Sequence, residues 1–303
     1  MCHDDLAFHF KTPRTSELPM PASREELNQQ GFVRVPGVFA PDQIADLRQV
    51  LEDLFSKPAP YDGDFDGRGK IGSIRFDVCA RNERLRWLLV HAPMLEVLRS
   101  LLGDNFVFLP EMAANAGGFG DWHKDTTSQE RAGHKFHQEV DFRMIQVAVY
   151  LQDNGDYGGG LDVIPGSRKL PDRYLSRMDH QTLVNRIRRR VTKQLGWNRI
   201  PENAETVPSQ AGDLVCFDVR LDHKASWPRV KTRPANVKYA VFFMASANND
   251  HARRYCDFIH SRADYIYFKG HQYPDDLLRL ASSNGVTLMQ MTPGQVTGSR
   301  SNC

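Results

Sequence analysis

The sequence has few cysteines and no long apolar run, and both absences exclude classes of protein. Its cysteines, Cys2, Cys79, Cys216, Cys256 and Cys303, are scattered and never form a CxxC pair. This distribution argues against a disulfide framework and against a cysteine zinc site. No stretch approaches the roughly 18 apolar residues of a membrane span, and the first residues lack the basic and apolar regions of a signal peptide. We therefore predict a cytoplasmic protein without a membrane segment.

The sequence also lacks internal repeats, low-complexity tracts and a strong net charge. The formal net charge is +2 at pH 7, which falls short of the basic footprint of a dedicated nucleic-acid binder. The interval from Arg168 to Arg199 is nevertheless rich in Arg and Lys, with only Asp172 and Asp179 to oppose them. An anion-binding or nucleic-acid-binding module that uses this segment stays open as an alternative.

What the sequence does contain is typical of a globular protein with a large core. Apolar residues make up 41% of the 303 residues and aromatic residues 10%. We expect a loosely held leader over residues 1–22 and one domain over 23–303. Within that domain we expect a core of strands at about 105–246, an Arg-rich insertion at about 168–211 and a C-terminal helical extension at about 247–303.

Hydrophobic periodicity predicts a mainly β protein with flanking helices. A short strand at 31–36 precedes an amphipathic helix that opens at Pro41, and a second helix is expected over 83–102. Short apolar runs separated by Gly, Pro, Asn and Asp follow. The expected strands are 106–109, 145–151, 161–164, 213–219 and 237–244. Such a series is typical of an antiparallel sandwich or barrel.

The pattern His123-Lys-Asp125 is the most informative chemical signal. Residues i and i+2 of a strand project to the same face, so an imidazole and a carboxylate can share one small space. A second imidazole would complete a two-histidine, one-carboxylate triad, which leaves coordination positions open on Fe(II). His223, which follows the strand-like run 213–219, is the candidate for that third position.

A second constellation, His134, His137 and Glu139, could supply ligands of the same type. Its surroundings are too polar and charged for a barrel strand. We interpret it as a solvated loop near the mouth of the site.

The context of the first pair resembles the phytanoyl-CoA dioxygenase-like family of Fe(II)/2-oxoglutarate-dependent oxygenases. The most specific stretch is 146–154, Gln-Val-Ala-Val-Tyr-Leu-Gln-Asp-Asn, followed by 158–169, Gly-Gly-Gly-Leu-Asp-Val-Ile-Pro-Gly-Ser-Arg-Lys. The family's usual histidine after Ser167 is Arg168 here, and that position is not a metal ligand in the family. The resemblance runs from roughly residue 31 to 244, and it implies a double-stranded β-helix (jelly-roll) core.

The resemblance also implies the roles of individual residues. His123, Asp125 and His223 fall on the metal motif, and Arg233 has the spacing of the arginine that binds the far carboxylate of 2-oxoglutarate. A guanidinium offers the bidentate geometry that a buried carboxylate needs, and Arg229 is the alternative. Tyr150 is either a co-substrate contact or packing in the barrel, and packing is the commoner role of a strand aromatic.

The function that follows is hydroxylation of an aliphatic carbon, with Fe(II), 2-oxoglutarate and dioxygen as cofactor and co-substrates and with release of succinate and CO2. Related halogenases carry Ala or Gly at the carboxylate position, so Asp125 argues against halogenation. The Arg-rich insertion suits a small anionic or glycosylated substrate. A metal-binding jelly-roll protein without oxygenase activity is the other alternative, and the sequence leaves the oligomeric state open.

Overall fold

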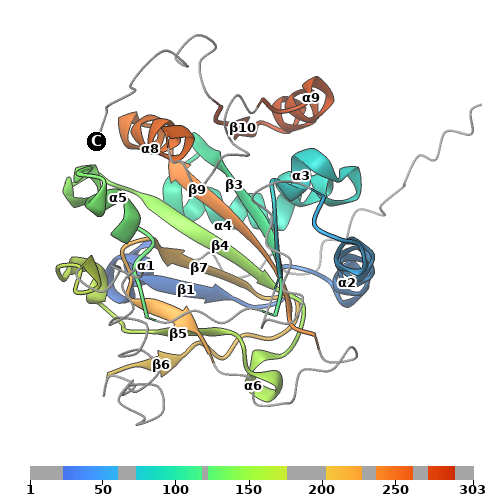
Figure 1. The fold of residues 1–303 in the computed structure, drawn as a ribbon, viewed down its shortest axis with the longest axis horizontal. Coiled ribbons are helices and arrows are strands. Elements are labelled where there is room, and N and C mark those ends of the chain that lie inside the picture. Colours follow the sequence, from blue (N-terminus) through green and yellow to red (C-terminus); the bar gives the residue numbers. More distant parts are fainter. Residues whose placement is uncertain are drawn as a thin grey trace, which may run out of the picture.

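The computed structural model describes residues 23–60, 73–117, 122–175, 203–226, 237–261 and 272–290. Two sheets of antiparallel strands face each other, and helices pack on the outer side of the larger sheet (Figure 1). This arrangement is a jelly-roll core with flanking helices, which confirms the predicted fold class. In chain order the described elements are α1 (Arg24–Gln30), β1 (Phe32–Val35), α2 (Pro41–Ser56), β2 (Ser73–Phe76), α3 (Val78–Arg81), η1 (Glu83–Val90), α4 (Ala92–Leu102), β3 (Phe106–Ala116), α5 (Thr127–Arg131), η2 (Phe136–Gln138), β4 (Met144–Tyr150), α6 (Asn154–Tyr157), β5 (Leu161–Val163), η3 (Ser167–Lys169), β6 (Glu205–Thr206), β7 (Leu214–Asp218), β8 (His223–Ala225), β9 (Tyr239–Ala247), α8 (Asp250–Ser261), α9 (Asp275–Ser283) and β10 (Thr287–Leu288).

The larger sheet has the strand order β1-β7-β4-β9-β3-β10, and β2 also pairs with β3. Its pairs are antiparallel except for β10, which lies parallel to β3. At the centre, Gln146 of β4 is opposite Phe217 of β7 on one side and Met244 of β9 on the other. The central strands read as nearly continuous apolar runs because both of their faces are covered.

The smaller sheet has the order β6-β5-β8, and it carries His223, the candidate for the third position of the predicted triad. Val163 of β5 is opposite His223 of β8, and an isolated bridge joins His223 to His123. Apolar side chains from both sheets fill the space between them. The buried members of this inner cluster are Ala148, Tyr150, Leu161, Val163, Val207, Val215, Phe217, Leu221 and Ala240.

The outer face of the larger sheet is covered by helices. Ile145, Val147 and Val149 belong to the core shared with the helices, whereas Ala148 and Tyr150 face the interior, as strand alternation requires. The helix expected over 83–102 is divided into η1 and α4. Pro93 in the first turn of α4 explains the division, since proline has no N–H to donate and its ring clashes with the carbonyl four residues earlier.

Strands from outside the interval 105–246 complete the larger sheet: β1 and β2 precede it and β10 follows it. The C-terminal helix α8 packs over an apolar cluster that includes Met244, Tyr255 and Ile259. Among the residues that the structure describes, no helix has the length and apolar character needed to cross a membrane.

Candidate metal centre

Two histidines and one aspartate meet beside the smaller sheet. The Nε2 atoms of His123 and His223 each lie 3.5 Å from Oδ1 of Asp125, and the two imidazole ring centres are 4.3 Å apart. One ligand atom from each residue lies within 4.8 Å of the other two. The structure therefore brings together the three side chains selected from the sequence, in an arrangement that a single metal ion could share.

Backbone hydrogen bonds position these side chains. His123 and His223 each donate a backbone N–H to the carbonyl of the other, and both N to O distances are 3.0 Å. The N–H of Asp125 donates to the carbonyl of Val219 at 3.0 Å, after which the chain turns. The regular strand expected at His123 and Asp125 is thus reduced to one bridge followed by a turn. The side chains of His123 and Asp125 nevertheless point into the same space.

A buried ion pair lies behind the cluster. Nζ of Lys124 is 2.8 Å from Oδ1 of Asp222, and the two residues are only 3% and 1% exposed. The ammonium also donates to the carbonyl of Ser167 at 2.7 Å and to the carbonyl of Arg220. Lys124 stands between two cluster residues in the sequence and Asp222 directly precedes the third. The pair therefore ties the two ligand-bearing segments together from the rear.

The second carboxylate oxygen of Asp222 binds Arg173. Nη2 and Nε of Arg173 donate to Oδ2 at 2.5 and 3.0 Å, and the N–H of Asp222 donates to Oγ of Ser167 at 2.8 Å. Arg173 belongs to the Arg-rich insertion expected at 168–211, of which residues 176–202 lie outside the described part of the chain. The start of that insertion is therefore anchored to the residue beside His223.

The electrostatics of the cluster favour ligands in their metal-binding forms. Burial lowers the pKa of His223 to about 4, against the opposing effect of Asp125, so its imidazole is neutral at pH 7. Burial alone would raise the pKa of Asp125, but the two histidines outweigh it and hold that pKa below its usual value. Nδ1 of His223 is 2.9 Å from the carbonyl of Leu221. A carbonyl can only accept, so we assign the proton to Nδ1, which leaves the Nε2 lone pair facing Asp125.

The residues present fit a bound Fe(II). Oδ2 of Asp125 is buried, and it has no hydrogen-bond partner among the described residues. A buried carboxylate oxygen without a partner is costly unless another group, such as a cation, satisfies it. The side chain of His123 is 45% exposed, so the cluster is accessible. Two imidazoles and one carboxylate are the facial donor set typical of non-haem iron.

The residues selected for 2-oxoglutarate are only partly within the described chain. Tyr150 lies on the inner face of β4 and is 1% exposed, and burial raises the pKa of its hydroxyl. Arg233 and its alternative Arg229 lie outside the described residues. Arg168 is held away from the cluster, since its Nε donates to the carbonyl of Asn28 at 2.9 Å.

The competing constellation does not form a cluster of its own. His137 is buried rather than solvated: Nδ1 is 2.9 Å from Nε2 of Gln129, and Nε2 is 3.3 Å from a carboxylate oxygen of Glu130. Glu139 is exposed and accepts two hydrogen bonds from the guanidinium of Arg254, at 3.0 and 2.8 Å. The loop is therefore tied to α5 and α8. The solvated-loop prediction was wrong for His137, whose polar neighbours gave no sign of burial.

Glu139 also lies 2.8 Å from Nε2 of His251, and Asp141 completes a second group with metal-ligand spacing. His251 was missed because it lies on α8, 112 residues further along the chain. The guanidinium of Arg254 already satisfies both oxygens of Glu139, and this arrangement is an ion pair rather than a site with free donors.

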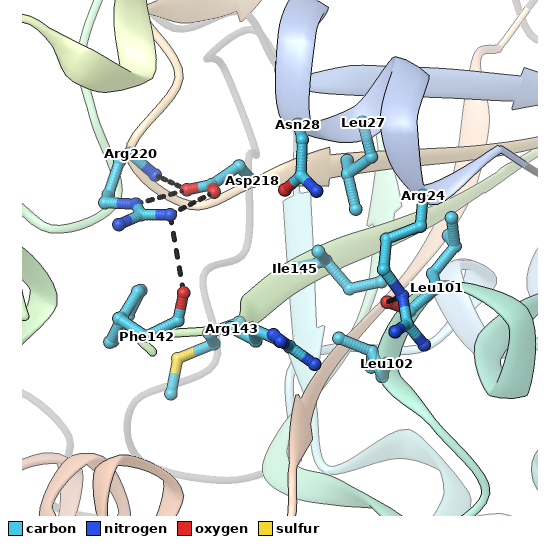
Figure 2. Close-up of a pocket in the computed structure, with 11 residues that line it drawn as sticks. Arg24, Leu27, Asn28, Leu101, Leu102, Phe142, Arg143, Ile145, Asp218 and Arg220 are labelled. Carbon is cyan, nitrogen blue, oxygen red and sulfur yellow. Dashed lines mark hydrogen bonds and ion pairs between the residues drawn. The ribbon is translucent and has the colours of Figure 1, made fainter. Parts of the chain in front are cut away.

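A separate small hollow, with an internal volume of about 30 Å³, lies on the outer face of the larger sheet. Figure 2 shows Arg24 of α1, Arg143 and Ile145 beside it, and Arg220 bound to Asp218 at its rim. The hollow includes none of the cluster residues, and it faces the helices rather than the barrel interior. We assign it no part in the site.

The fold and the site together define a jelly-roll protein with a two-histidine, one-carboxylate cluster. Residues 27–228 match the family Phytanoyl-CoA dioxygenase (PhyH). The chain belongs to this family, as the sequence predicted.

The sequence alignments with relatives of this chain cover only part of each protein. Ectoine dioxygenase of Sphingopyxis alaskensis is 27% identical over 189 residues, which cover 55% of this chain and 59% of that protein. Ectoine dioxygenase of Stutzerimonas stutzeri is 24% identical over 235 residues, or 71% of this chain and 74% of that protein. The crystal structure of EctD from S. alaskensis with bound Fe has a TM-score of 0.52 and 18% identity, and covers 78% of this chain and 83% of that chain. The match thus spans about three fifths of the first relative's length, and the structural likeness supports the fold.

Proposed function

We propose that this chain is an Fe(II)- and 2-oxoglutarate-dependent dioxygenase that hydroxylates an aliphatic carbon of a small molecule. The observation that carries the proposal is the convergence of His123, Asp125 and His223, with one buried oxygen of Asp125 left without a partner. The family supports the reaction class, and the relatives are named dioxygenases.

In this proposal the protein holds and orients the reactants. His123 and His223 would hold Fe(II) through Nε2, and Asp125 would hold it through its carboxylate. Bound iron supplies the redox chemistry that activates dioxygen. Lys124 and Asp222 fix the spacing of the ligand segments from behind. A carboxylate at position 125, where related halogenases carry Ala or Gly, favours hydroxylation over halogenation.

The far carboxylate of 2-oxoglutarate requires a cation inside the barrel. Arg233, with Arg229 as the alternative, is our proposal from the sequence for that contact. Tyr150 lines the same interior on β4 and is available as a hydroxyl donor. The apolar side chains around Tyr150 exclude water from this end of the site, which strengthens any charge interaction made there.

The substrate we propose is a small anionic or glycosylated molecule. The Arg-rich segment begins beside the cluster, and Arg173 fixes its first residues to Asp222. Ectoine belongs in any substrate panel because relatives of this chain are named ectoine dioxygenases.

The proposal is tested by anaerobic addition of Fe(II) and 2-oxoglutarate, followed by exposure to air with candidate substrates. We expect a weak visible absorption band from the iron–keto-acid complex, and succinate release in the presence of ectoine or of other small anionic or glycosylated compounds. His223→Ala should show neither. A wild-type protein that binds iron but gives no band and no succinate would leave only metal binding, and the oxygenase proposal would be withdrawn.

A further inference from the structure

The chain that follows η3 contacts both ligand-bearing segments of the metal centre. Residues 172–174, Asp-Arg-Tyr, make these contacts, and we call them the clasp. Asp172 binds Thr127, which is 45 residues away in the sequence, and Arg173 binds Asp222, which is 49 residues away. The contacts of the clasp are therefore long-range, and packing rather than local sequence brings them together.

One side of the clasp holds the turn that carries Asp125. Oγ1 of Thr127 donates to Oδ2 of Asp172 at 2.6 Å. The backbone N–H of Thr127 donates to the carbonyl of Lys124 at 3.1 Å, which closes the turn across Asp125. Thr127 is buried. The hydrogen bond between Thr127 and Asp172 therefore fixes the end of the turn from which Asp125 projects.

The other side of the clasp holds the residue before His223. Nη2 and Nε of Arg173 both donate to Oδ2 of Asp222. Two N–H groups on one carboxylate constrain its direction as well as its distance. The side chain of Arg173 is half-exposed, whereas that of Asp222 is buried. Arg173 thus orients a buried carboxylate, and the backbone beside it, from the surface.

Internal contacts hold the two arms of the clasp relative to each other. The N–H of Tyr174 donates to Oδ1 of Asp172 at 2.6 Å, and the hydroxyl of Tyr174 accepts from Nε of Arg173 at 3.2 Å. The guanidinium lies 5.5 Å from the centre of the Tyr174 ring. Nη2 of Arg131 on α5 also donates to the carbonyl of Leu175 at 2.8 Å. A shift at one arm is therefore passed to the other.

The clasp is a second connection between segments that Lys124 and Asp222 already join. One ion pair fixes a single distance, but it lets one segment rotate relative to the other. A second connection at Thr127 opposes that rotation. Such control matters at a metal centre, because ligands must be held within about 0.5 Å of the productive geometry.

We propose that Asp172 and Arg173 are positioning residues of the metal centre, which hold Asp125 and His223 in the relative orientation that one metal ion requires. This inference rests on the proposed function, because it concerns the same site. Asp172 acts through Thr127, and Arg173 acts through Asp222. The start of the Arg-rich insertion thereby becomes part of the support of the metal centre.

The test uses Co(II) in place of Fe(II), because the visible absorption of bound Co(II) reports the number and geometry of its ligands. A site of this type binds both ions. Anaerobic titration of the full chain gives a dissociation constant and a spectrum for the wild type and for each variant. Thermal unfolding is measured in parallel. His223→Ala identifies the part of the spectrum that comes from this site.

The variants remove one contact at a time. Thr127→Val removes the hydroxyl and keeps the shape of the side chain, and Thr127→Ser restores the hydroxyl. Arg173→Met removes the guanidinium, and Arg173→Lys restores only its charge. Arg34→Met is the matched control, since the partly exposed Arg34 binds the buried Asp213 at 3.0 Å elsewhere in the fold.

We expect Thr127→Val and Arg173→Met each to change the spectrum of bound Co(II) and to weaken its binding about three- to tenfold. This loss is smaller than the roughly 10- to 100-fold typical of residues that contact a ligand directly. Thr127→Ser should restore the wild-type spectrum, and Arg173→Lys should restore affinity only in part, because lysine lacks the fork. Arg34→Met should lower the midpoint of unfolding and leave the spectrum unchanged, as expected for a contact that is only structural.

The outcomes separate this proposal from the proposed function. Wild-type protein with the same Co(II) spectrum as His223→Ala would hold no metal at the cluster, which would overturn the proposed function itself. Wild-type protein that holds Co(II) there, with the same spectrum in Thr127→Val or in Arg173→Met, would overturn the clasp, since both of its arms are required. An equal spectral change in Arg34→Met would overturn it as well.

Discussion

Lys124 and Asp222 form a buried ion pair with Nζ 2.8 Å from Oδ1, and each is adjacent in sequence to a residue of the metal cluster. The pair joins the segment of His123 and Asp125 to the start of β8. Its position makes it the rear support of the site, separate from the ligands themselves.

Lys124→Met should destabilise the fold and weaken iron binding together. Removing Lys124 leaves Oδ1 of the buried Asp222 without its cation, while Arg173 still binds Oδ2. We therefore expect a cost below the roughly 3–5 kcal/mol of a buried charge that loses its only partner. We expect a lower midpoint of thermal unfolding and a weaker affinity for Fe(II), measured by calorimetry and by anaerobic titration. The double variant Lys124→Met/Asp222→Leu should recover part of the stability. Equal iron affinity in wild type and Lys124→Met would show that the pair does not position the ligands.

The three histidines of the region should respond differently to alanine. His123→Ala and His223→Ala each remove a proposed ligand and should lower iron affinity by more than about 100-fold. His137→Ala should cost folding stability, since it breaks buried contacts with Gln129 and Glu130, but it should leave iron stoichiometry unchanged. The measurement is metal content after dialysis against a weak chelator. Full iron loading of His223→Ala would remove His223 from the ligand set.

Gly159→Ala should destabilise the turn before β5. Gly159 has φ +75°, in the left-handed region that costs a residue with a Cβ about 1–2 kcal/mol. Its new methyl group would also lie 2.8 Å from Cδ of Lys238 and displace that side chain. We expect a lower free energy of unfolding, measured by chemical denaturation. Gly155→Ala is the control, because a Cβ there meets nothing within 4 Å.

Sequence reasoning was most successful where the pattern is local. Strand alternation, turn residues and the His-x-Asp spacing located the central strands and two of the cluster residues. His223 was selected as the imidazole that follows the strand-like run 213–219, and the resemblance supported that choice. The contact itself is long-range, since an isolated bridge joins His123 to His223 across 100 residues of sequence. Pro93 was visible in the sequence, yet the apolar residues on either side of it suggested one continuous helix.

The side chains that were missed depend on which face of a strand or helix is inside. His251 contacts Glu139 only because α8 packs against the loop before β4. Such contacts arise from the packing of distant elements and leave no periodic signal.

The carboxylate of Asp222 binds two cations from different parts of the chain, Lys124 through one oxygen and Arg173 through the other. The residue at position 222 must therefore match two cations. If Asp222 is replaced, a change at Lys124 alone or at Arg173 alone still leaves the other cation without its carboxylate. In relatives with a different insertion we expect positions 124, 173 and 222 to vary together. An engineer who exchanges the insertion to alter substrate range would need to place the junction after Arg173, so that Asp222 keeps both of its partners.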